Sequence, residues 1–270
     1  MPPFAVPPLS RLIDVHVHLD QWPFRRLPHD TTAALLSKLR KQNVTAAWVC
    51  SYDALLHRDL KAVNERLLES CGKSGQDILK PVGAVNLTLS GWELDAEYCW
   101  KSGMHGVRIY PGYHLSDLDD GRFSALCEFC QEKNLILQIV AGLEDSRTEH
   151  PQFASRLMEL KPALELIPKY PRLRILFSNP GREISQGVAA RLSKAGHVYF
   201  DLGMIEQTGG VAAYAHAVSQ ERLVFGSHFP FFYFEASLLK LRENEEALGQ
   251  QGLDRVAFQN AEQLLQRIDG

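Results

Sequence analysis

Several features that mark other protein classes are missing from this sequence. No apolar run is long enough to cross a membrane. The first eight residues lack the charged region and apolar stretch of a secretory signal, and their four prolines predict an extended or poorly ordered arm over residues 1–10. The net charge of -3 provides no basic field. Nucleic acid is therefore excluded as a main partner, and no membrane attachment is expected.

Motifs for nucleotide-dependent and serine-hydrolase chemistry are also absent, since there is no glycine-rich phosphate loop and no nucleophile elbow. The five cysteines are an odd number scattered along the chain, which favours reduced thiols in a cytoplasmic protein. Cys127 and Cys130 form a C-x-x-C motif, but no second such pair exists to complete a four-thiolate zinc site. Their spacing predicts thiols buried on the core face of a helix.

Short β-rich runs alternate with amphipathic stretches along the whole chain. The expected strands are Arg11–His18, Val44–Ser51, Lys80–Asn86, Gly106–Tyr110, Leu135–Ala141, Leu173–Asn179, His197–Gly203 and Arg222–His228. The expected helices cover residues 31–42, 57–71, 92–102, 117–133, 153–169, 185–195, 206–219 and 235–248. This pattern predicts an α/β fold, a single (β/α)₈ TIM barrel over residues 11–270. An extra C-terminal helix over Asp254–Ile268 is expected to cover its flank or base.

Side chains alternate between the two faces of a strand, which predicts the residues that line the barrel. Those expected to face the helices on the first strand are Ile13, Val15 and Val17. Those expected to face inward are Asp14, His16 and His18 on the first strand, Arg108 and Tyr110 on the fourth, and Tyr199 and Asp201 on the seventh. Polar groups thus gather toward the carboxyl ends of the strands, where barrel active sites lie.

His16 and His18 are the sharpest functional signal. Two histidines at positions i and i+2 of a strand share one face and can hold one cation, because neutral imidazole is a good ligand for zinc and similar metals. The alternative is a pair of hydrogen-bonded barrel histidines without a metal. Their position on the first strand of an apparent barrel favours the metal site.

Four segments of the chain together resemble the amidohydrolase superfamily, in particular its amidohydrolase-related branch of hydrolases, lactonases and non-oxidative decarboxylases. The segments are the His-x-His of the first strand, Gly106–Pro111 on the fourth, Arg222–Pro230 on the eighth, and Asn260-Ala261 with Leu264-Leu265 in the closing helix. The resemblance implies a TIM barrel with a metal-dependent active site for a small molecule.

The chain departs from the ligand set that this resemblance implies. Members commonly add a histidine on the fifth strand, another on the sixth and an aspartate on the eighth, whereas this chain has Val140, Asn179 and His228 there. What remains is a site of His16, His18 and His228 for one divalent metal, zinc in the first place. His228 would be the third ligand or a general base, unless it only hydrogen-bonds in a metal-free barrel.

Other side chains complete the predicted site. Arg108 is expected to hold a substrate carboxylate or to pair with an interior acid. Asp201 is expected to relay protons as a catalytic residue beside His228. Tyr110, His114 and Asn179 are expected to contact the substrate.

Two neighbouring segments keep open interpretations. The loop after the fifth strand offers Glu144 or His150 as a replacement ligand, although a self-paired surface loop is the favoured interpretation. The aromatic run Phe229–Phe234 could wall a pocket or anchor the last helix.

The main prediction is a metal-dependent hydrolase of an amide, ester or lactone. Two alternatives stay open, namely non-oxidative decarboxylation of a small unsaturated or aromatic acid, and a barrel without catalysis that binds a ligand or a protein. A small acidic substrate and a homodimer are the expected partners.

Overall fold

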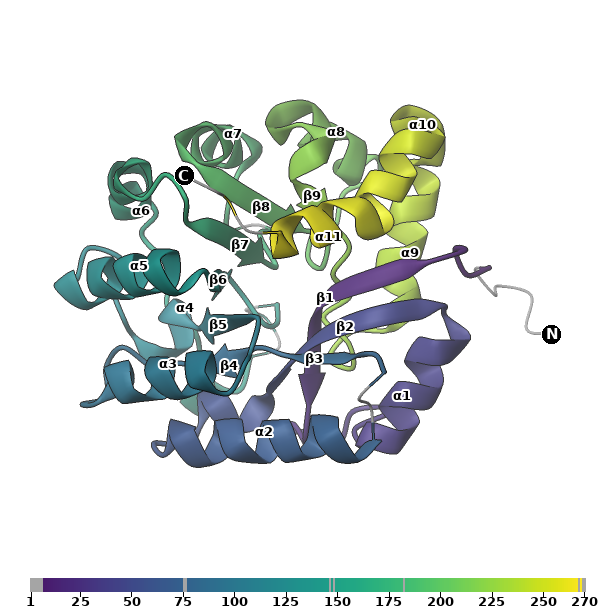
Figure 1. The fold of residues 1–270 in the computed structure, drawn as a ribbon. Coiled ribbons are helices and arrows are strands. Elements are labelled where there is room, and N and C mark those ends of the chain that lie inside the picture. Colours follow the sequence, from purple (N-terminus) through teal and green to yellow (C-terminus); the bar gives the residue numbers. More distant parts are fainter. Residues whose placement is uncertain are drawn as a thin grey trace.

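Parallel strands form a central ring with helices around it in the computed structural model, which describes residues 7–74, 77–145, 147, 149–181, 183–266 and 268 (Figure 1). The strands are β1 Leu12–Leu19, β2 Val44–Ser51, β3 Leu79–Pro81, β4 Gly83–Ala84, β5 Gly106–Ile109, β6 Ile136–Val140, β7 Arg174–Ser178, β8 His197–Asp201 and β9 Leu223–Val224. The helices are α1 Thr32–Lys41, α2 Leu60–Ser74, α3 Trp92–Lys101, α4 Pro111–His114, α5 Gly121–Lys133, α6 Lys161–Leu166, α7 Gln186–Ala195, α8 Gly210–Val218, α9 Phe234–Glu243, α10 Glu245–Asp254 and α11 Asn260–Leu265.

Two parallel sheets make up the ring. One has the order β1-β2-β3 and the other β4-β5-β6-β7-β8-β9, and β3 and β4 are two halves of one barrel strand separated by Val82. On the opposite side, the segment after β9 bonds to β1: Val15 N donates to Phe225 O at 3.0 Å, and His18 N donates to Phe229 O at 2.9 Å. These bonds join the two sheets, and the predicted TIM barrel is confirmed.

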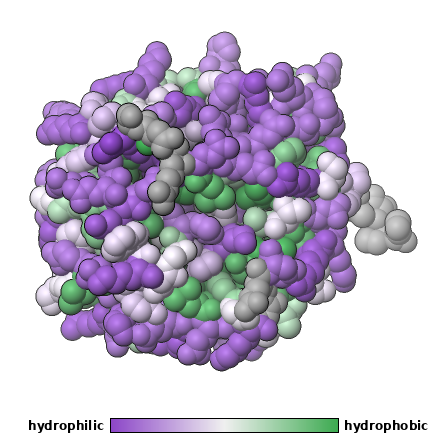
Figure 2. Space-filling view, viewed as in Figure 1, coloured by the Kyte–Doolittle hydropathy of each residue, from purple (hydrophilic) through white to green (hydrophobic). Residues whose placement is uncertain are grey.

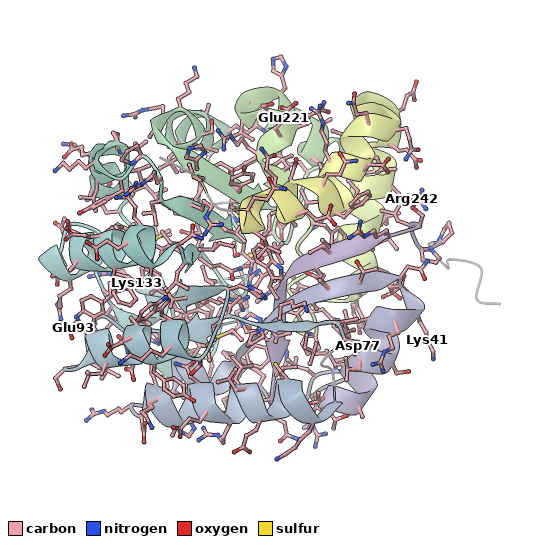
Figure 3. The ribbon with its side chains drawn as sticks, in the orientation of Figure 1. Lys41, Asp77, Glu93, Lys133, Glu221 and Arg242 are labelled. Atoms are coloured by element: carbon pink, nitrogen blue, oxygen red, sulfur yellow. The ribbon has the colours of Figure 1, made fainter. Side chains whose placement is uncertain are left out.

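Three buried apolar clusters divide the interior. The largest fills the layer between the strands and the helices. A second closes the base of the barrel, where strand residues such as Leu176 and Val224 meet Ala261 and Leu264 of α11. The third lies at the carboxyl end and includes Trp22 and Phe231. Buried polar side chains lie between base and mouth, whereas charged side chains such as Asp77 and Glu221 lie at the outer edge of the molecule (Figure 3).

The predicted alternation of side chains between helix-facing and interior positions is right on β5 and β8, the fourth and seventh predicted strands. It is wrong on part of β1. Ile13 and Val15 do not face the helices but pack in the base cluster inside the barrel. The cause is a register shift between Asp14 and Val17, where β1 has one more residue than β2. An extra residue reverses the alternation, so His16 and His18 still face the interior while Asp14 points to Ser227.

Some predicted helices differ in extent. The stretch expected to be helical over residues 153–169 begins its α-helix only at Lys161, after a short 3₁₀ turn at Pro151–Phe153. The stretch over 235–248 is divided at Asn244 into α9 and α10. The closing helix consists of a π-turn, Arg255–Gln259, followed by α11, and Asn260 fixes it to β9 by donating to the carbonyl of Leu223 at 2.7 Å.

The remaining expectations concern the chain's first residues, its thiols and its surface. Residues 1–6 of the predicted arm lie outside the described part, while Pro7 and Pro8 are exposed against Arg242. All five cysteines are free and buried, as predicted for Cys127 and Cys130. None of the described helices combines the length and apolarity needed to span a bilayer. The face in Figure 2 is mostly hydrophilic, with hydrophobic residues exposed in small groups.

Candidate metal centre

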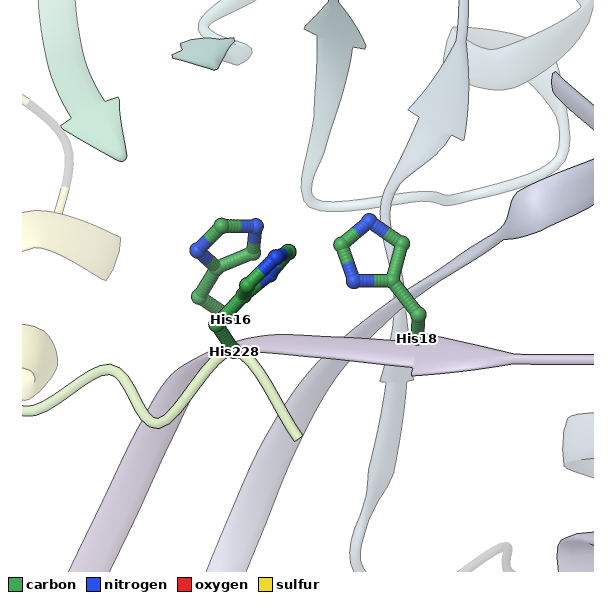
Figure 4. A group of neighbouring side chains, drawn as sticks. All are labelled: His16, His18 and His228. Carbon is green, nitrogen blue, oxygen red and sulfur yellow. The ribbon is translucent and has the colours of Figure 1, made fainter. Parts of the chain in front are cut away.

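The three predicted histidines meet at the carboxyl end of the barrel (Figure 4). His16 and His18 come from β1, and His228 comes from the segment that follows β9. One nitrogen of each ring lies within 4.8 Å of the corresponding nitrogens of the other two, and all three side chains are fully buried. Among the described residues, no other histidines, cysteines or carboxylates form such a group.

Each ring uses one nitrogen and leaves the other free. His16 Nδ1 lies 2.9 Å from Asp201 Oδ2, and His228 Nε2 lies 2.7 Å from the carbonyl oxygen of Leu143. A carboxylate and a carbonyl can only accept, so these two nitrogens carry the protons. His16 Nε2 and His228 Nδ1 then present lone pairs, and neither has a hydrogen-bond partner in the described part of the chain.

His18 differs because two groups share its Nε2. The Tyr110 hydroxyl lies 3.2 Å away and Arg108 Nη1 lies 3.3 Å away. If Nε2 donates its proton to Tyr110, the unpaired Nδ1 presents a lone pair toward the other two rings. A metal requires this tautomer, in which Tyr110 accepts, whereas Arg108, which can only donate, favours the other one.

Burial makes the three rings neutral. It lowers the pKa of His16 despite the opposing contact with Asp201, and it lowers the pKa values of His18 and His228 well below the ordinary value, with Arg108 adding to both effects. Metal ligands must be unprotonated, so the rings are in the form that binds a cation. Three converging, unpaired, neutral nitrogens fit a divalent metal with mainly nitrogen ligands.

Asp201 is an orienting group in this arrangement. Burial works to raise its pKa, but hydrogen bonds from His16 and from the backbone N–H groups of Asn179 and Gly203 outweigh it and hold the pKa below the ordinary value. The carboxylate is therefore charged and its oxygens are occupied. The predicted proton relay is less suited to this geometry than a role in fixing the His16 ring.

Arg108 contacts His18 and is fully buried. Its guanidinium donates to Gln138 Oε1 at 2.9 Å and to the carbonyl oxygens of Val17 and Trp48 at 3.3 and 3.4 Å. Within the described residues no carboxylate pairs with it, so the predicted interior acid partner is not found. The positive charge remains uncompensated beside the three rings.

Asn179 stands where the resemblance implies a histidine, and it is fully buried. Its Nδ2 donates to the carbonyl of Gly142 at 2.7 Å, and its Oδ1 has no hydrogen-bond partner among the described residues. Both Asn179 and His228 have positive φ, 54° and 56°, which is uncommon away from glycine and concentrates at functional sites. A Cβ added at Gly203 would lie 2.1 Å from Asn179 Oδ1, so this close packing requires glycine.

Aromatic rings cover the centre. The Phe231 ring stacks on His228 at 5.0 Å between centroids, and Tyr52 stacks on His18 at 4.5 Å. Trp22 packs against both aromatic rings in the mouth cluster. Phe231 therefore walls the site, and sequence reasoning missed Tyr52, although its position at the carboxyl end of β2 could have indicated it.

Three candidates lie apart from the histidine group. His114 Nε2 donates to the carbonyl of Ala54 at 3.0 Å, and burial lowers its pKa to about 4. The His150 ring stacks on Phe24 at 4.5 Å, while Glu144 pairs with Arg25 at 3.3 Å. Neither His150 nor Glu144 joins the three histidines as a replacement ligand.

Comparison with known proteins decides the family, since the family model described as Amidohydrolase matches residues 13–267. The chain belongs to the amidohydrolase family. The predicted superfamily and its enzymatic character are thereby confirmed. No curated protein matches this family member in sequence.

Solved structures share its fold at low identity. 5-Carboxyvanillate decarboxylase from Sphingomonas paucimobilis has a TM-score of 0.75 and 12% identity, with 96% of this chain and 100% of that chain covered. A dihydroxybenzoic acid decarboxylase from Polaromonas was solved with manganese and the inhibitor 2-nitroresorcinol. It has a TM-score of 0.73 and 14% identity, with 95% of this chain and 97% of that chain covered. 2,6-Dihydroxybenzoate decarboxylase from Rhizobium has a TM-score of 0.71 and 13% identity, with 95% of this chain and 99% of that chain covered. At these identities the likeness shows the fold.

Proposed function

We propose that this amidohydrolase-family chain is a metal-dependent, non-oxidative decarboxylase of a small aromatic or unsaturated acid. The observation that carries the proposal is a group of three ring nitrogens beside a buried guanidinium, where, among the described residues, the nitrogens have no partner and the guanidinium has no carboxylate. The decarboxylases that share the fold support this choice over the hydrolase that the sequence first suggests.

The charge of the centre favours an anionic ligand. A divalent cation, Arg108 and Asp201 together give +2, from +2, +1 and -1. Asp14, whose pKa burial raises to about 7, adds at most one further negative charge. A buried site with residual positive charge is stabilised when a carboxylate binds in it.

His16, His18 and His228 would hold the metal, which when bound supplies a Lewis acid for the oxygen atoms of the substrate. Asp201 and the Leu143 carbonyl fix two of the rings, while Phe231, Tyr52 and Trp22 exclude water from the reacting group. In the reaction the carbon–carbon bond to the carboxylate breaks, and carbon dioxide leaves. The electron pair stays on the substrate carbon, which takes up a proton that originates from water.

Hydrolysis of an ester, lactone or amide is the second candidate, because a hydroxide would also compensate the positive charge of the centre. The same three histidines would serve, since three protein ligands and one water are a workable zinc arrangement. Zinc remains the prediction from the all-nitrogen ligand set, and manganese is the alternative. The homodimer likewise remains a prediction.

Metal content and product analysis test the proposal together. The untagged protein is analysed for metals, loaded with zinc or manganese, and given 2,6-dihydroxybenzoate, 5-carboxyvanillate, and a panel of lactones and esters. We expect about one equivalent of metal per chain and carbon dioxide release from at least one acid. Hydrolysis products without carbon dioxide would support the second candidate, and failure to bind either metal after reconstitution would overturn both.

A further inference from the structure

The mouth of the barrel contains a buried hydroxyl that has no assigned role, on Tyr52. This residue begins the 3₁₀ turn Tyr52–Leu55 that follows β2, and its ring lies parallel to His18, with 4.5 Å between centroids and 6° between ring planes. Tyr52 is fully buried, and its hydroxyl has no hydrogen-bond partner among the described residues. Buried polar groups without a partner are rare in native proteins, so this hydroxyl requires an explanation.

Two other tyrosines pack in the mouth, and both use their hydroxyl groups. Tyr110 Oη lies 3.2 Å from His18 Nε2. Tyr113 Oη donates to Glu149 Oε1 at 3.2 Å. The free hydroxyl of Tyr52 is therefore not a general result of packing aromatic side chains at this end of the barrel.

The Tyr52 hydroxyl points across the mouth toward the segment that carries His228. The backbone N–H of Phe231, three residues after His228, approaches the hydroxyl oxygen without completing a hydrogen bond. An N–H group is a donor, so it can engage only a lone pair of that oxygen. Within the described residues, the hydroxyl hydrogen therefore faces no acceptor.

A ligand at the metal centre must lie close to this hydroxyl. His16, His18 and His228 are fully buried, and the rings that stack on them include Tyr52 over His18 and Phe231 over His228. The Tyr52 and Phe231 rings are themselves neighbours, with 6.2 Å between centroids. A small molecule that reaches the histidines thus lies among these rings, and its polar end comes within reach of the unused donor.

The charges around the Tyr52 hydroxyl favour an anionic acceptor. The guanidinium groups of Arg108 and Arg25 both act on it electrostatically. Glu144 balances Arg25 at 3.3 Å, whereas Arg108 has no carboxylate partner among the described residues. A carboxylate at this position would meet a positive potential and a free hydrogen-bond donor together.

We propose that the Tyr52 hydroxyl binds the carboxylate of the substrate by donating a hydrogen bond to one of its oxygen atoms. Tyr52 is then a substrate-binding residue that selects acids over neutral compounds of the same shape. This inference rests on the proposed function for the presence of a carboxylate at the metal centre. The carboxylate loses its charge as carbon dioxide forms, so the hydrogen bond strengthens binding of the acid rather than the reaction step.

Calorimetric titration of the zinc- or manganese-loaded protein with benzoate and nitrobenzene tests the inference. The two ligands have the same shape, but the nitro group is uncharged and is a poor acceptor. Tyr52→Phe removes the hydroxyl and keeps the ring, so benzoate should bind roughly 10–100-fold more weakly, while nitrobenzene binding and metal content stay as in wild type. Tyr98→Phe, on the outer helix α3, is the matched control and should leave benzoate binding unchanged.

The benzoate titration decides the inference. Equal binding of benzoate by the wild type and Tyr52→Phe would overturn it, as would a wild type that does not bind benzoate. A variant that loses metal, or that weakens nitrobenzene as much as benzoate, would assign Tyr52 to packing over His18 and not to the carboxylate.

Carbon dioxide release separates this inference from the proposed function. If Tyr52→Phe weakens benzoate binding but no acid releases carbon dioxide, the contact between Tyr52 and the carboxylate stands and the decarboxylation fails. If an acid is decarboxylated, KM should rise in Tyr52→Phe by the same factor as the Kd of benzoate, and kcat should not fall. An unchanged KM would overturn the inference and leave the proposed function standing.

Discussion

The two ends of the barrel satisfy their buried polar groups to different extents. At the base, apolar side chains fill the interior, and α11 covers them with Ala261 and Leu264. One buried polar atom of this cluster, Trp48 Nε1, has no partner among the described residues. The buried guanidinium at that end, on Arg174, donates to the carbonyl oxygens of Leu264 and Gln266, both at 2.8 Å. At the mouth, three histidine nitrogens and the amide oxygen of Asn179 have no hydrogen-bond partner among the residues that the structure describes.

This difference indicates which end the fold keeps for chemistry. An unsatisfied buried polar atom costs about 1–3 kcal/mol of folding free energy, and such atoms persist in native proteins mainly where they have a use. Four lie on His16, His18, His228 and Asn179, next to one another in the barrel. Substitutions at the mouth should therefore affect metal and activity, whereas those at the base should affect stability.

The largest effect is expected from His16→Ala, which removes a ligand from the centre. Metal should fall from about one equivalent to background, and the rate should drop by at least the roughly 10²–10³-fold that one preorganised electrostatic group contributes. Plasma emission spectrometry and carbon dioxide release measure the two effects. His57→Ala, at an exposed surface histidine, is the control and should behave like wild type. A His16→Ala protein that keeps its metal would disprove the three-histidine site.

At the base, Leu264→Ala should change stability without changing the metal. The side chain is 1% exposed, and its removal leaves a cavity worth about 2–5 kcal/mol of unfolding free energy. Urea unfolding measures the loss, and Leu157→Ala, at a side chain exposed to solvent, should cost less than about 0.5 kcal/mol. Metal lost in proportion to stability would show that the two ends are not independent.

Asp201→Asn should have a smaller effect, confined to the mouth. An amide oxygen can still accept from the N–H groups of Asn179 and Gly203, but the amide nitrogen would then face His16 Nδ1. Two donors repel, so His16 would turn or change tautomer and weaken its grip on the metal by roughly 10–100-fold. Competition with a chelator measures this affinity. Unchanged affinity would contradict the orienting role of Asp201.

Much of the difference between the two barrel ends could be predicted from the sequence, because the alternation of side chains along each strand determines which of them face the interior. Alternation along the strands located the barrel, and the resemblance of the eighth-strand segment brought His228 to the pair on β1. The first strand shows the limit of this reasoning, since one extra residue between Asp14 and Val17 reversed the expected faces of Ile13 and Val15. A bulge of this kind leaves no mark in the hydrophobic pattern.

The partners of the histidines were harder to predict, because they depend on distances between strands. The Leu143 carbonyl is a backbone group, so no side-chain type announces its bond to His228. Arg108 was expected to face the barrel, and it does, but its bonds to the carbonyls of Val17 and Trp48 arise only from the closed ring. Sequence reasoning offered the same guanidinium to a substrate carboxylate or to an interior acid, and it could not foresee these carbonyl partners.

The smallest effect is expected from Tyr110→Phe, which tests how the mouth selects a tautomer. Without the hydroxyl, His18 Nε2 loses its acceptor at 3.2 Å and keeps only the donor Arg108 at 3.3 Å. The proton then moves to Nδ1, and the metal must displace it, which should lower metal affinity by roughly tenfold, or about 1.4 kcal/mol. Stability should change little because the ring still fills the mouth cluster. Nitrogen-detected NMR of the His18 ring in metal-free protein reports the tautomer directly. A wild-type ring already protonated at Nδ1 would remove Tyr110 from the argument and leave Arg108 as the group that governs His18.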